Sequence, residues 1–387
     1  MDSVKPIPVA VLGDGVTGQA VSAYLRQSTS YEQVTVDAAQ WVVVSPGIPP
    51  RKWPKTTAEI LSDNEFAYRI LHQKNPKLVM IGVTGTNGKT TVVSALAHAL
   101  GVRAYGNIGR PLIQDVDTID VSKPIVIELS SYQLVTTTTM RFTIGVIMNI
   151  EPDHYDWHES YENYRDAKCR LSTLSSVLYA PQAVWSHCAK DHCEWVNTDA
   201  LTPQCLPPLT ARHDQHNAAL IQAILQRLGQ APAYVQQKMA TFERPPFRYE
   251  TIFCSEDLCI INDSKATNMA ATEAALASVV GGPVLLILCG QAKSDYTMDF
   301  MNRVTERCDW VYAAGGLSRN RHQFPVSSQG AIQFFDTLYD ATCAALMQCV
   351  KGIILFSPSA ASFDEFTNYE ARGKAFTTYV DHIQTMA

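Results

Sequence analysis

Short apolar runs, many of them rich in β-branched residues, alternate along the chain with turns rich in Gly, Asn or Asp and with stretches of helical periodicity. These runs occupy residues 9–12, 42–44, 78–83, 125–129, 144–149, 285–288 and 353–356. Runs of this length separated by helical stretches are typical of βαβ units, whose strands lie parallel. The pattern therefore predicts an α/β fold built on mostly parallel sheets.

Two interruptions of this pattern predict where domains join. Residues 74–77 (KNPK) interrupt it before the third run, and residues 243–246 (ERPP) interrupt it again later. Proline and charge concentrate in segments that link domains. A chain of 387 residues is long enough for two or three domains. We expect three, at residues 1–75, 76–244 and 245–387.

The composition narrows the class of protein. Apolar residues make up 46% and charged residues 18% of the chain, with a net charge of -6, which indicates a globular protein without a basic surface for nucleic acid. The longest apolar run, near residues 285–289, is far shorter than the roughly 20 residues of a membrane helix. The amino-terminal residues lack the parts of a signal peptide. We expect a cytoplasmic protein that contacts neither nucleic acid nor the membrane interior.

The cysteines are spread singly, which favours reduced thiols over a disulfide framework. One cluster of metal-ligating residue types, His187, Cys188, His192 and Cys193, raises the alternative of a zinc site. Its spacing fits no standard zinc module. We therefore favour a chance grouping in a polar loop.

A phosphate-binding loop is predicted within residues 78–100, where an apolar strand, the turn TGTNGKTT and a helical stretch follow one another. Gly85 and Gly88 allow the backbone N–H groups and the helix N-terminus to converge on phosphate oxygens. Lys89 adds a cation near the β- and γ-phosphates, and Thr90 offers a hydroxyl group to Mg²⁺. The segment therefore predicts nucleotide binding.

Two further strands end in groups suited to a hard cation. Glu128 ends the apolar run of IVIELSSYQL, and Asp153 and His154 follow the run of IGVIMNIEPDH. Ligands of open α/β sheets bind at the carboxyl ends of the strands, and oxygen ligands suit Mg²⁺. We expect these side chains to face the same crevice as the phosphates.

Lys168 is placed by its spacing on one helical face with Tyr161, Tyr164 and Leu171. A lysine on such a face can extend its ammonium group to solvent. Alternatively, desolvation lowers its pKa and leaves a neutral amine that reacts with CO₂ to give a carbamate. Both interpretations stay open from the residues alone.

Taken together and in this order, TGTNGKTT, ELSSYQL, the Asp153-His154 pair and Lys168 resemble the Mur ligase family. The resemblance implies a Rossmann-like N-terminal domain, a central P-loop ATPase-like domain with a mostly parallel sheet, and a Rossmann-like C-terminal domain. It also implies ATP-dependent amide-bond formation through an acyl phosphate, with two Mg²⁺. The implied catalytic residues are Lys89, Glu128, His154 and Lys168, and the implied metal ligands are Thr90, Glu128, His154 and carbamylated Lys168.

The closing motifs INDSKATN and SPSAASFDEFTNYEARG look like those of the family members that add D-glutamate to UDP-N-acetylmuramoyl-L-alanine in peptidoglycan precursor synthesis. From the residues alone, INDSKATN is a strand-to-helix turn with Asp263 or Ser264 as a candidate cap. The resemblance implies a monomer that binds ATP through Gly85, Thr86, Asn87, Gly88, Lys89, Thr90, Thr91, Asn217, Arg248 and Asp263. It implies D-glutamate binding through Asp153, Lys265, Thr267, Lys293, Ser362 and Tyr369.

The amino-terminal segment VLGDGVTG places Gly13, Gly15 and Gly18 after a strand, with Asp37 at the end of the next. Alone, this is a dinucleotide fingerprint, and a nicotinamide-dependent dehydrogenase is the competing class of enzyme. The family resemblance, strengthened by the SPGI turn, implies a UDP-binding domain instead, abridged after Asp37. The implied UDP-sugar ligands are Gly15, Thr17, Asp37, Ser45, Gly47, Asn107, Ser130 and Gln133.

The chain departs from the family pattern at two positions. Asp214 stands where an asparagine is usual, and Ala292 replaces the acid before Lys293. An inactive scaffold of cell-wall synthesis is a third class to consider. We disfavour it because the residues of the implied metal site are all present.

Overall fold

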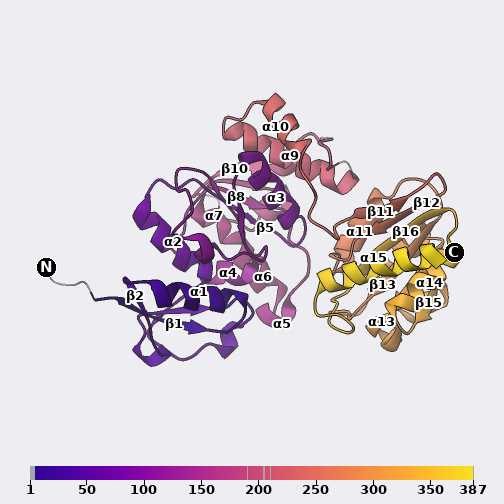
Figure 1. Ribbon diagram of the computed structural model, residues 1–387, viewed down its shortest axis with the longest axis horizontal. Helices are drawn as coiled ribbons and strands as arrows, with labels where there is room; N and C mark the ends of the chain where they lie inside the picture. The colour runs from indigo at the N-terminus through magenta and orange to yellow at the C-terminus, as the bar shows by residue number, and fades with distance from the viewer. Residues whose placement is uncertain (1–4, 190, 204, 210, 387) are drawn as a thin grey trace. The chain divides into compact units, whose positions relative to one another are not determined.

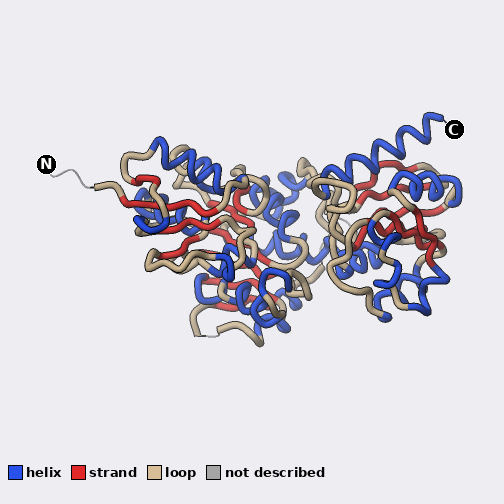
Figure 2. Tube along the Cα trace, turned by 90° about the horizontal axis from the view of Figure 1, so that it is seen from below, coloured by secondary structure: helices blue, strands red, loops and turns tan. Residues whose placement is uncertain are grey.

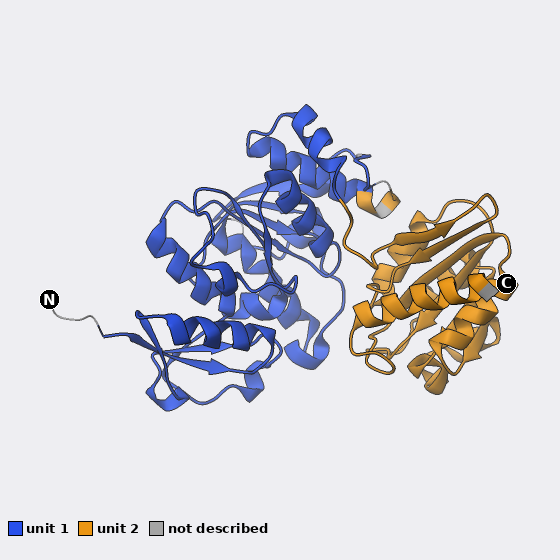
Figure 3. Ribbon diagram, viewed as in Figure 1, with its two compact units in different colours: residues 1–209, 215–242 blue, residues 210–214, 243–387 orange. Residues whose placement is uncertain are grey.

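The computed structural model describes residues 5–189, 191–203, 205–209 and 211–386. The chain divides into two compact units, coloured separately in Figure 3. Unit 1 comprises Met1–Leu209 and Gln215–Phe242, and unit 2 comprises Thr210–Asp214 and Glu243–Ala387. None of the helices in the described part of the chain has both the length and the apolar character needed to span a bilayer.

Unit 1 begins with a small parallel sheet in the order β2-β1-β3-β4 (Figure 1). Its strands are β1 (Ile7–Leu12), β2 (Tyr31–Gln33), β3 (Trp41–Val44) and β4 (Glu59–Leu61), and its helices are α1 (Val16–Gln27) and α2 (Asp63–Lys74). Val9, Val21 and Phe66 belong to a core that continues into the second sheet of unit 1. Burial of this shared apolar surface ties the first sheet to the second.

The second sheet of unit 1 is parallel throughout, in the order β10-β9-β8-β5-β7-β6. Its strands are β5 (Met80–Thr84), β6 (Ala104–Gly106), β7 (Ile125–Glu128), β8 (Phe142–Ile147), β9 (Ser175–Ala180) and β10 (Glu194–Asn197). Its helices are α3 (Lys89–Leu100), α4 (Ser131–Val135), α5 (Tyr155–His158), α6 (Tyr161–Cys169), α7 (Leu171–Leu174), α8 (Gln182–Trp185), α9 (Arg212–Arg227) and α10 (Pro232–Met239). Every residue of β5 is buried because apolar clusters cover both faces of this sheet.

Unit 2 contains a third sheet in the order β11-β12-β16-β13-β14-β15, in which only the edge strand β11 is antiparallel to its neighbour. Its strands are β11 (Glu250–Cys254), β12 (Leu258–Asn262), β13 (Val284–Cys289), β14 (Trp310–Ala314), β15 (Ile332–Phe335) and β16 (Gly352–Ser359). Its helices are α11 (Met269–Ser278), α12 (Met298–Arg307), α13 (Gly316–Arg319), α14 (Leu338–Gln348) and α15 (Tyr369–Met386). Figure 2 shows the strands in red and the helices in blue.

The predicted α/β class and mostly parallel sheets are confirmed, and each predicted apolar run coincides with a strand. Two local predictions are wrong. Asp37 does not end a strand, because β2 stops at Gln33 and Asp37 lies in a short 3₁₀ helix, η1 (Val36–Ala38). The cap of α11 is neither Asp263 nor Ser264 but Asn268, whose side chain accepts a hydrogen bond from the N–H of Ala271. The turn after β12 is therefore longer than the sequence suggested.

Candidate functional site

The loop between β5 and α3 has the backbone form of a phosphate-binding loop. Gly85 and Gly88 have φ angles of 149° and 84°, which favour glycine. A Cβ atom at Gly85 would lie 2.7 Å from the Cβ of Met148, so the loop also has no room there for a side chain. Helix α3 starts directly after Gly88, and its N-terminus therefore points its free N–H groups toward the loop.

Asn149, which the sequence analysis did not single out, holds this loop in place. Its side-chain oxygen accepts hydrogen bonds from the backbone N–H groups of Thr86 and Asn87, at 3.1 and 2.9 Å. Asn149 lies two positions beyond the end of β8, the strand beside β5. The only signal for it in the sequence was its position after a buried strand, close to the Asp153-His154 pair. Asn217 also lies at the loop, since a Cβ at Gly88 would be 3.5 Å from its side-chain oxygen.

Lys89 and Lys168 come together at one atom of the loop. The Nζ of Lys89 donates to the carbonyl oxygen of Gly85 at 2.8 Å, and so does the Nζ of Lys168, also at 2.8 Å. Lys168 is only 2% exposed and does not reach solvent. Burial, and next the positive charge of Lys89, hold the pKa of Lys168 well below the usual range of a lysine. These surroundings favour a neutral amine at Lys168.

Glu128 ends β7 beside the loop. Its Oε2 accepts a hydrogen bond from the hydroxyl group of Thr90 at 2.7 Å, and its Oε1 accepts one from the side-chain amide of Asn107 at 3.1 Å. Its exposed fraction is 2%, and the ion pairs found among the described residues do not include it. A buried carboxylate whose hydrogen-bond donors are neutral suits a divalent cation.

His154 belongs to the same cluster. Its ring lies 5.8 Å from the ring of Tyr164, and the Nζ of Lys168 lies 4.7 Å from the centre of that same ring. The hydroxyl group of Tyr164 in turn makes a 2.8 Å hydrogen bond with Thr86 of the phosphate-binding loop. The neighbouring Asp153 is buried, and its Oδ1 accepts the backbone N–H of His154.

Sheet order explains this convergence. β5 lies between β7 and β8, and all three run parallel. Their carboxyl ends therefore deliver the phosphate-binding loop, Glu128 and the segment carrying His154 to one edge of the sheet. Lys168 reaches that edge from α6.

The residues implied for UDP-sugar binding are spread over both sheets of unit 1. Gly15, Asp37, Gly47 and Asn107 are exposed, while Thr17 is half-buried. Ser130 and Gln133 form the capping box of α4, and Gln133 also donates to the buried carboxyl group of Asp63 at 3.0 Å. The Oγ of Ser45 is buried without a hydrogen-bond partner among the described residues, and Ser45 and Gln133 line the same small cavity. This cavity joins the SPGI turn to the ELSSYQL segment.

Unit 2 carries the remaining implied ligands. Asp263 accepts hydrogen bonds from the N–H of Tyr249 and the hydroxyl group of Ser357, and burial raises its pKa to about 7. The Nζ of Lys265 lies 4.1 Å from the ring centre of Tyr369. The other implied ligands in unit 2 differ in exposure: Lys293 is exposed, Thr267 and Arg248 are half-buried, and Ser362 is buried. The carbonyl oxygen of Arg248 accepts a hydrogen bond from the side chain of Arg244.

Arg372 is a residue of this region that the sequence analysis missed. It is fully buried and donates to the carbonyl oxygens of Cys289, Ala360 and Ser264. It therefore fixes the ends of β13 and β16 relative to the turn after β12. The sequence NYEARG gives no signal that this arginine is buried, because most arginines in proteins lie at the surface.

Asp214, one of the two departures from the family pattern, forms an ion pair with Arg244. Its side chain is 1% exposed and that of Arg244 is 17% exposed, so the pair is largely withdrawn from water. An asparagine at this position could not supply the compensating charge. Asp214 therefore has a structural partner within unit 2.

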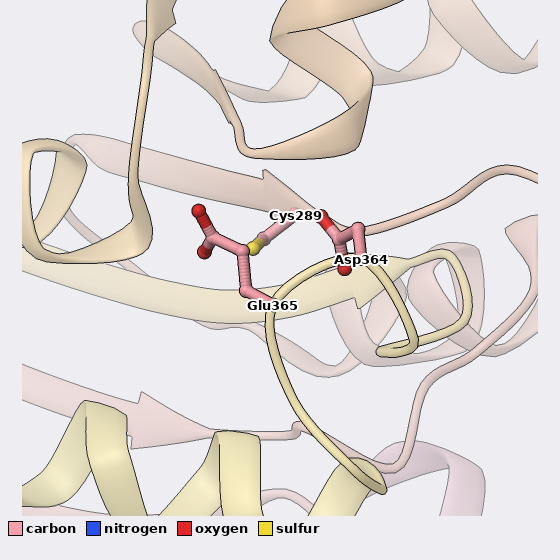
Figure 4. Close-up of side chains that lie close together, drawn as sticks. All are labelled: Cys289, Asp364 and Glu365. Atoms are coloured by element: carbon pink, nitrogen blue, oxygen red, sulfur yellow. The ribbon is translucent and has the colours of Figure 1, made fainter.

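The described residues bring together one further group of metal-ligating types, Cys289, Asp364 and Glu365 (Figure 4). Asp364 already has a structural role. Its Oδ2 accepts a hydrogen bond, at 2.6 Å, from the N–H of Gly316, the first residue of α13. His187, Cys188, His192 and Cys193 do not form such a group among the described residues. The Sγ of Cys188 instead points to the carbonyl oxygen of Val184.

Comparison with known proteins gives consistent results. Residues 83–180 match the family model described as the Mur ligase middle domain. A UDP-N-acetylmuramoylalanine--D-glutamate ligase of Protochlamydia amoebophila is 30% identical, over 90% of this chain and 85% of that protein. The enzyme of the same name from Chlamydia caviae is 30% identical over 98% of both chains.

The fold also matches solved structures. The MurF ligase of Thermotoga maritima, solved in complex with ADP, superposes with a TM-score of 0.64 at 14% identity, over 99% of this chain and 96% of that one. A folylpolyglutamate synthase of Mycobacterium tuberculosis gives a TM-score of 0.58 over 82% of this chain. Sequence relatives of near full length, a matching central domain and a shared fold agree, and the chain belongs to the Mur ligase family.

Proposed function

We propose that this protein is an ATP-dependent ligase that adds D-glutamate to UDP-N-acetylmuramoyl-L-alanine. The relatives of near full length carry that activity in their names. A carboxylate oxygen of the L-alanine end attacks the γ-phosphorus of ATP, which gives an acyl phosphate and ADP. The amine of D-glutamate then attacks the acyl carbon, loses a proton and displaces inorganic phosphate, which leaves an amide bond.

The observation that carries this proposal is the meeting of Lys89, Lys168 and the phosphate-binding loop at Gly85. The loop amides and the N-terminus of α3 would hold the phosphates of ATP. The ammonium group of Lys89 would stabilise the negative charge that develops on the transferred phosphoryl group, chiefly by electrostatics and positioning.

The donor set fits magnesium. Thr90 and Glu128 would hold one ion, and His154 and a carbamylated Lys168 would hold a second. Magnesium supplies positive charge that offsets the charge of the phosphates. Support comes from the near-complete burial of Glu128, with a hydroxyl group and an amide as its hydrogen-bond partners.

The carbamate follows from the environment of Lys168. Its neutral amine attacks the carbon of CO₂, a C–N bond forms, and the nitrogen loses one proton to give an N-carboxylate. The reaction requires the neutral amine, which is favoured here because burial, and next the positive charge of Lys89, disfavour the ammonium form. A carboxylate at the end of this long side chain is a ligand type that magnesium prefers.

Three ligand regions complete the proposal. UDP-sugar contacts are assigned to the first sheet of unit 1 and to Asn107, Ser130 and Gln133, and D-glutamate contacts to Asp153 and the implied residues of unit 2. We assign residues 1–75, 76–244 and 245–387 to UDP-sugar binding, ATP binding, and amino-acid and ATP binding. Closure of the last domain would exclude water from the acyl phosphate. We further propose a cytoplasmic monomer.

An amino-acid panel scored for ADP formation tests the reaction. ADP release should require UDP-N-acetylmuramoyl-L-alanine and D-glutamate together, and other amino acids should give little. Lys89→Ala serves as the inactive reference and Lys123→Ala, at an exposed turn, as the control that keeps activity. Preference for another amino acid would overturn the assigned substrate, and NAD binding without ATP binding would favour a dehydrogenase.

A further inference from the structure

Tyr132 of ELSSYQL contacts the implied metal ligand His154 directly. Its hydroxyl oxygen lies 2.7 Å from the Nδ1 of His154, and the two rings are 5.0 Å apart. The pair joins α4 to the start of α5. Neither the reaction nor the metal ligand set described above uses this hydroxyl group.

The imidazole of His154 needs such a partner. His154 has a φ of 59°, in the left-handed region, and its side chain is 35% exposed, so burial alone does not fix the orientation of the ring. The nearest oxygen of Asp153 lies 3.6 Å from Nδ1 and is already within 2.8 Å of the backbone N–H of His154. The hydroxyl oxygen of Tyr132, at 2.7 Å, lies closer to Nδ1 than this carboxylate oxygen does.

Tyr132 is itself held firmly. Its ring stacks on Trp157 at 4.6 Å and on His158 at 5.5 Å. The indole N–H of Trp157 donates to the carbonyl oxygen of Pro46, and His158 bonds with the hydroxyl group of Ser131. The hydroxyl group of Tyr132 therefore occupies a position set by packing, not by a freely rotating side chain.

A hydrogen bond at one imidazole nitrogen determines what the other can do. If Nδ1 carries the hydrogen and donates it to the Tyr132 oxygen, Nε2 keeps its lone pair and can bind a cation. Groups that fix a metal-binding histidine in this way typically change metal affinity by about 10- to 100-fold when removed.

We propose that Tyr132 is a positioning residue that holds His154 in the orientation and tautomer needed to bind a divalent cation through Nε2. The inference rests on the proposed function, because it takes His154 as a magnesium ligand. It adds a role for a residue outside the metal ligand set proposed above. The aromatic stack of Tyr132, Trp157 and His158 would then also hold the hydroxyl group of Tyr132 against His154.

The test is Tyr132→Phe, which keeps the ring and its stacking and removes only the hydroxyl group. Binding of Mn²⁺ to the full-length protein with ATP, followed by electron paramagnetic resonance, should weaken about 10-fold. The Mg²⁺ concentration for half-maximal activity should rise by about the same factor, while kcat at saturating Mg²⁺ stays within about 2-fold. Tyr161→Phe, which removes a hydroxyl group bonded to the carbonyl oxygen of Ile150, is the matched control and should bind Mn²⁺ normally.

A double-mutant cycle shows whether the effect passes through His154. In a His154→Ala background, Tyr132→Phe should change Mn²⁺ affinity no further. Equal Mn²⁺ affinity of the wild type and Tyr132→Phe would overturn the proposal, and so would an undiminished effect in the His154→Ala background. A wild type that binds Mn²⁺ with the expected Tyr132 dependence but does not ligate D-glutamate would leave this inference standing and refute the proposed substrate.

Discussion

Lys89 and Lys168 donate to the same carbonyl oxygen, that of Gly85, each at 2.8 Å. Two ammonium groups that share one acceptor repel each other, and only one of them is buried away from water. The pKa of Lys168 is lowered as a result, mainly by burial and to a smaller extent by the charge of Lys89. The arrangement thus disfavours the ammonium form of Lys168.

Replacing Lys168 by alanine should lower kcat by on the order of 10²- to 10³-fold, as expected for loss of one group that stabilises the transition state. Added formate or acetate should restore part of the activity by supplying the missing carboxylate. Rates of ADP formation with and without these anions measure the effect. Full activity of the variant, or loss without any rescue, would contradict the carbamate role.

Replacing Glu128 by glutamine should separate activity from stability. The amide keeps the shape and can still accept from Thr90, but it lacks the charge that suits a cation. We expect weaker Mg²⁺ activation and a loss of activity on the order of 10²-fold. Thermal unfolding without divalent cations should occur at the same or a higher temperature, because a buried charge whose hydrogen-bond donors are neutral is removed. A lower unfolding temperature would show that the carboxylate is needed for folding.

Glu65 should prove essential for stability although it lies outside the site. It is fully buried, and its carboxylate accepts the backbone N–H groups of Thr138, Thr139 and Met140. Glu65→Gln would leave one or more of these groups poorly paired, at a cost of about 2–4 kcal/mol. Urea denaturation measures this free energy, and Glu162→Gln on an exposed position is the control. A change below about 0.5 kcal/mol in the free energy of unfolding of the Glu65 variant would refute this stabilising role.

Asp63 should make stability depend on pH. Burial raises its pKa from 3.8 to about 6 in the folded protein. Between about pH 4 and pH 6 the unfolded chain has released this proton while the folded chain retains it, so the free energy of unfolding contributed by Asp63 falls as pH rises. Asp63→Asn should remove that part of the slope, as measured by urea denaturation across this range. Identical slopes in the variant and the wild type would show that Asp63 ionises normally.

Much of the fold was accessible from the sequence because its signals are local. The apolar runs became the expected strands, the glycines of the phosphate-binding loop took the predicted conformation, and Glu128 ended its strand as expected. Each of these depends on residues a few positions apart, where strand length, φ preference and helix starts are encoded directly. The predicted meeting of the site residues at one sheet edge followed from the general rule for parallel sheets.

Other features were decided only by the tertiary structure. Lys168 and Gly85 are 83 positions apart, and whether Lys168 reaches solvent or the loop depends on how α6 packs. The same holds for Tyr132 on His154, Asn149 on the loop amides and Arg244 on Asp214. Sequence spacing gives the face of an element on which a side chain lies, but the partner on that face is set by sheet order and burial. That choice of partner determines that Lys168 lies buried against the phosphate-binding loop and that the imidazole of His154 lies against Tyr132.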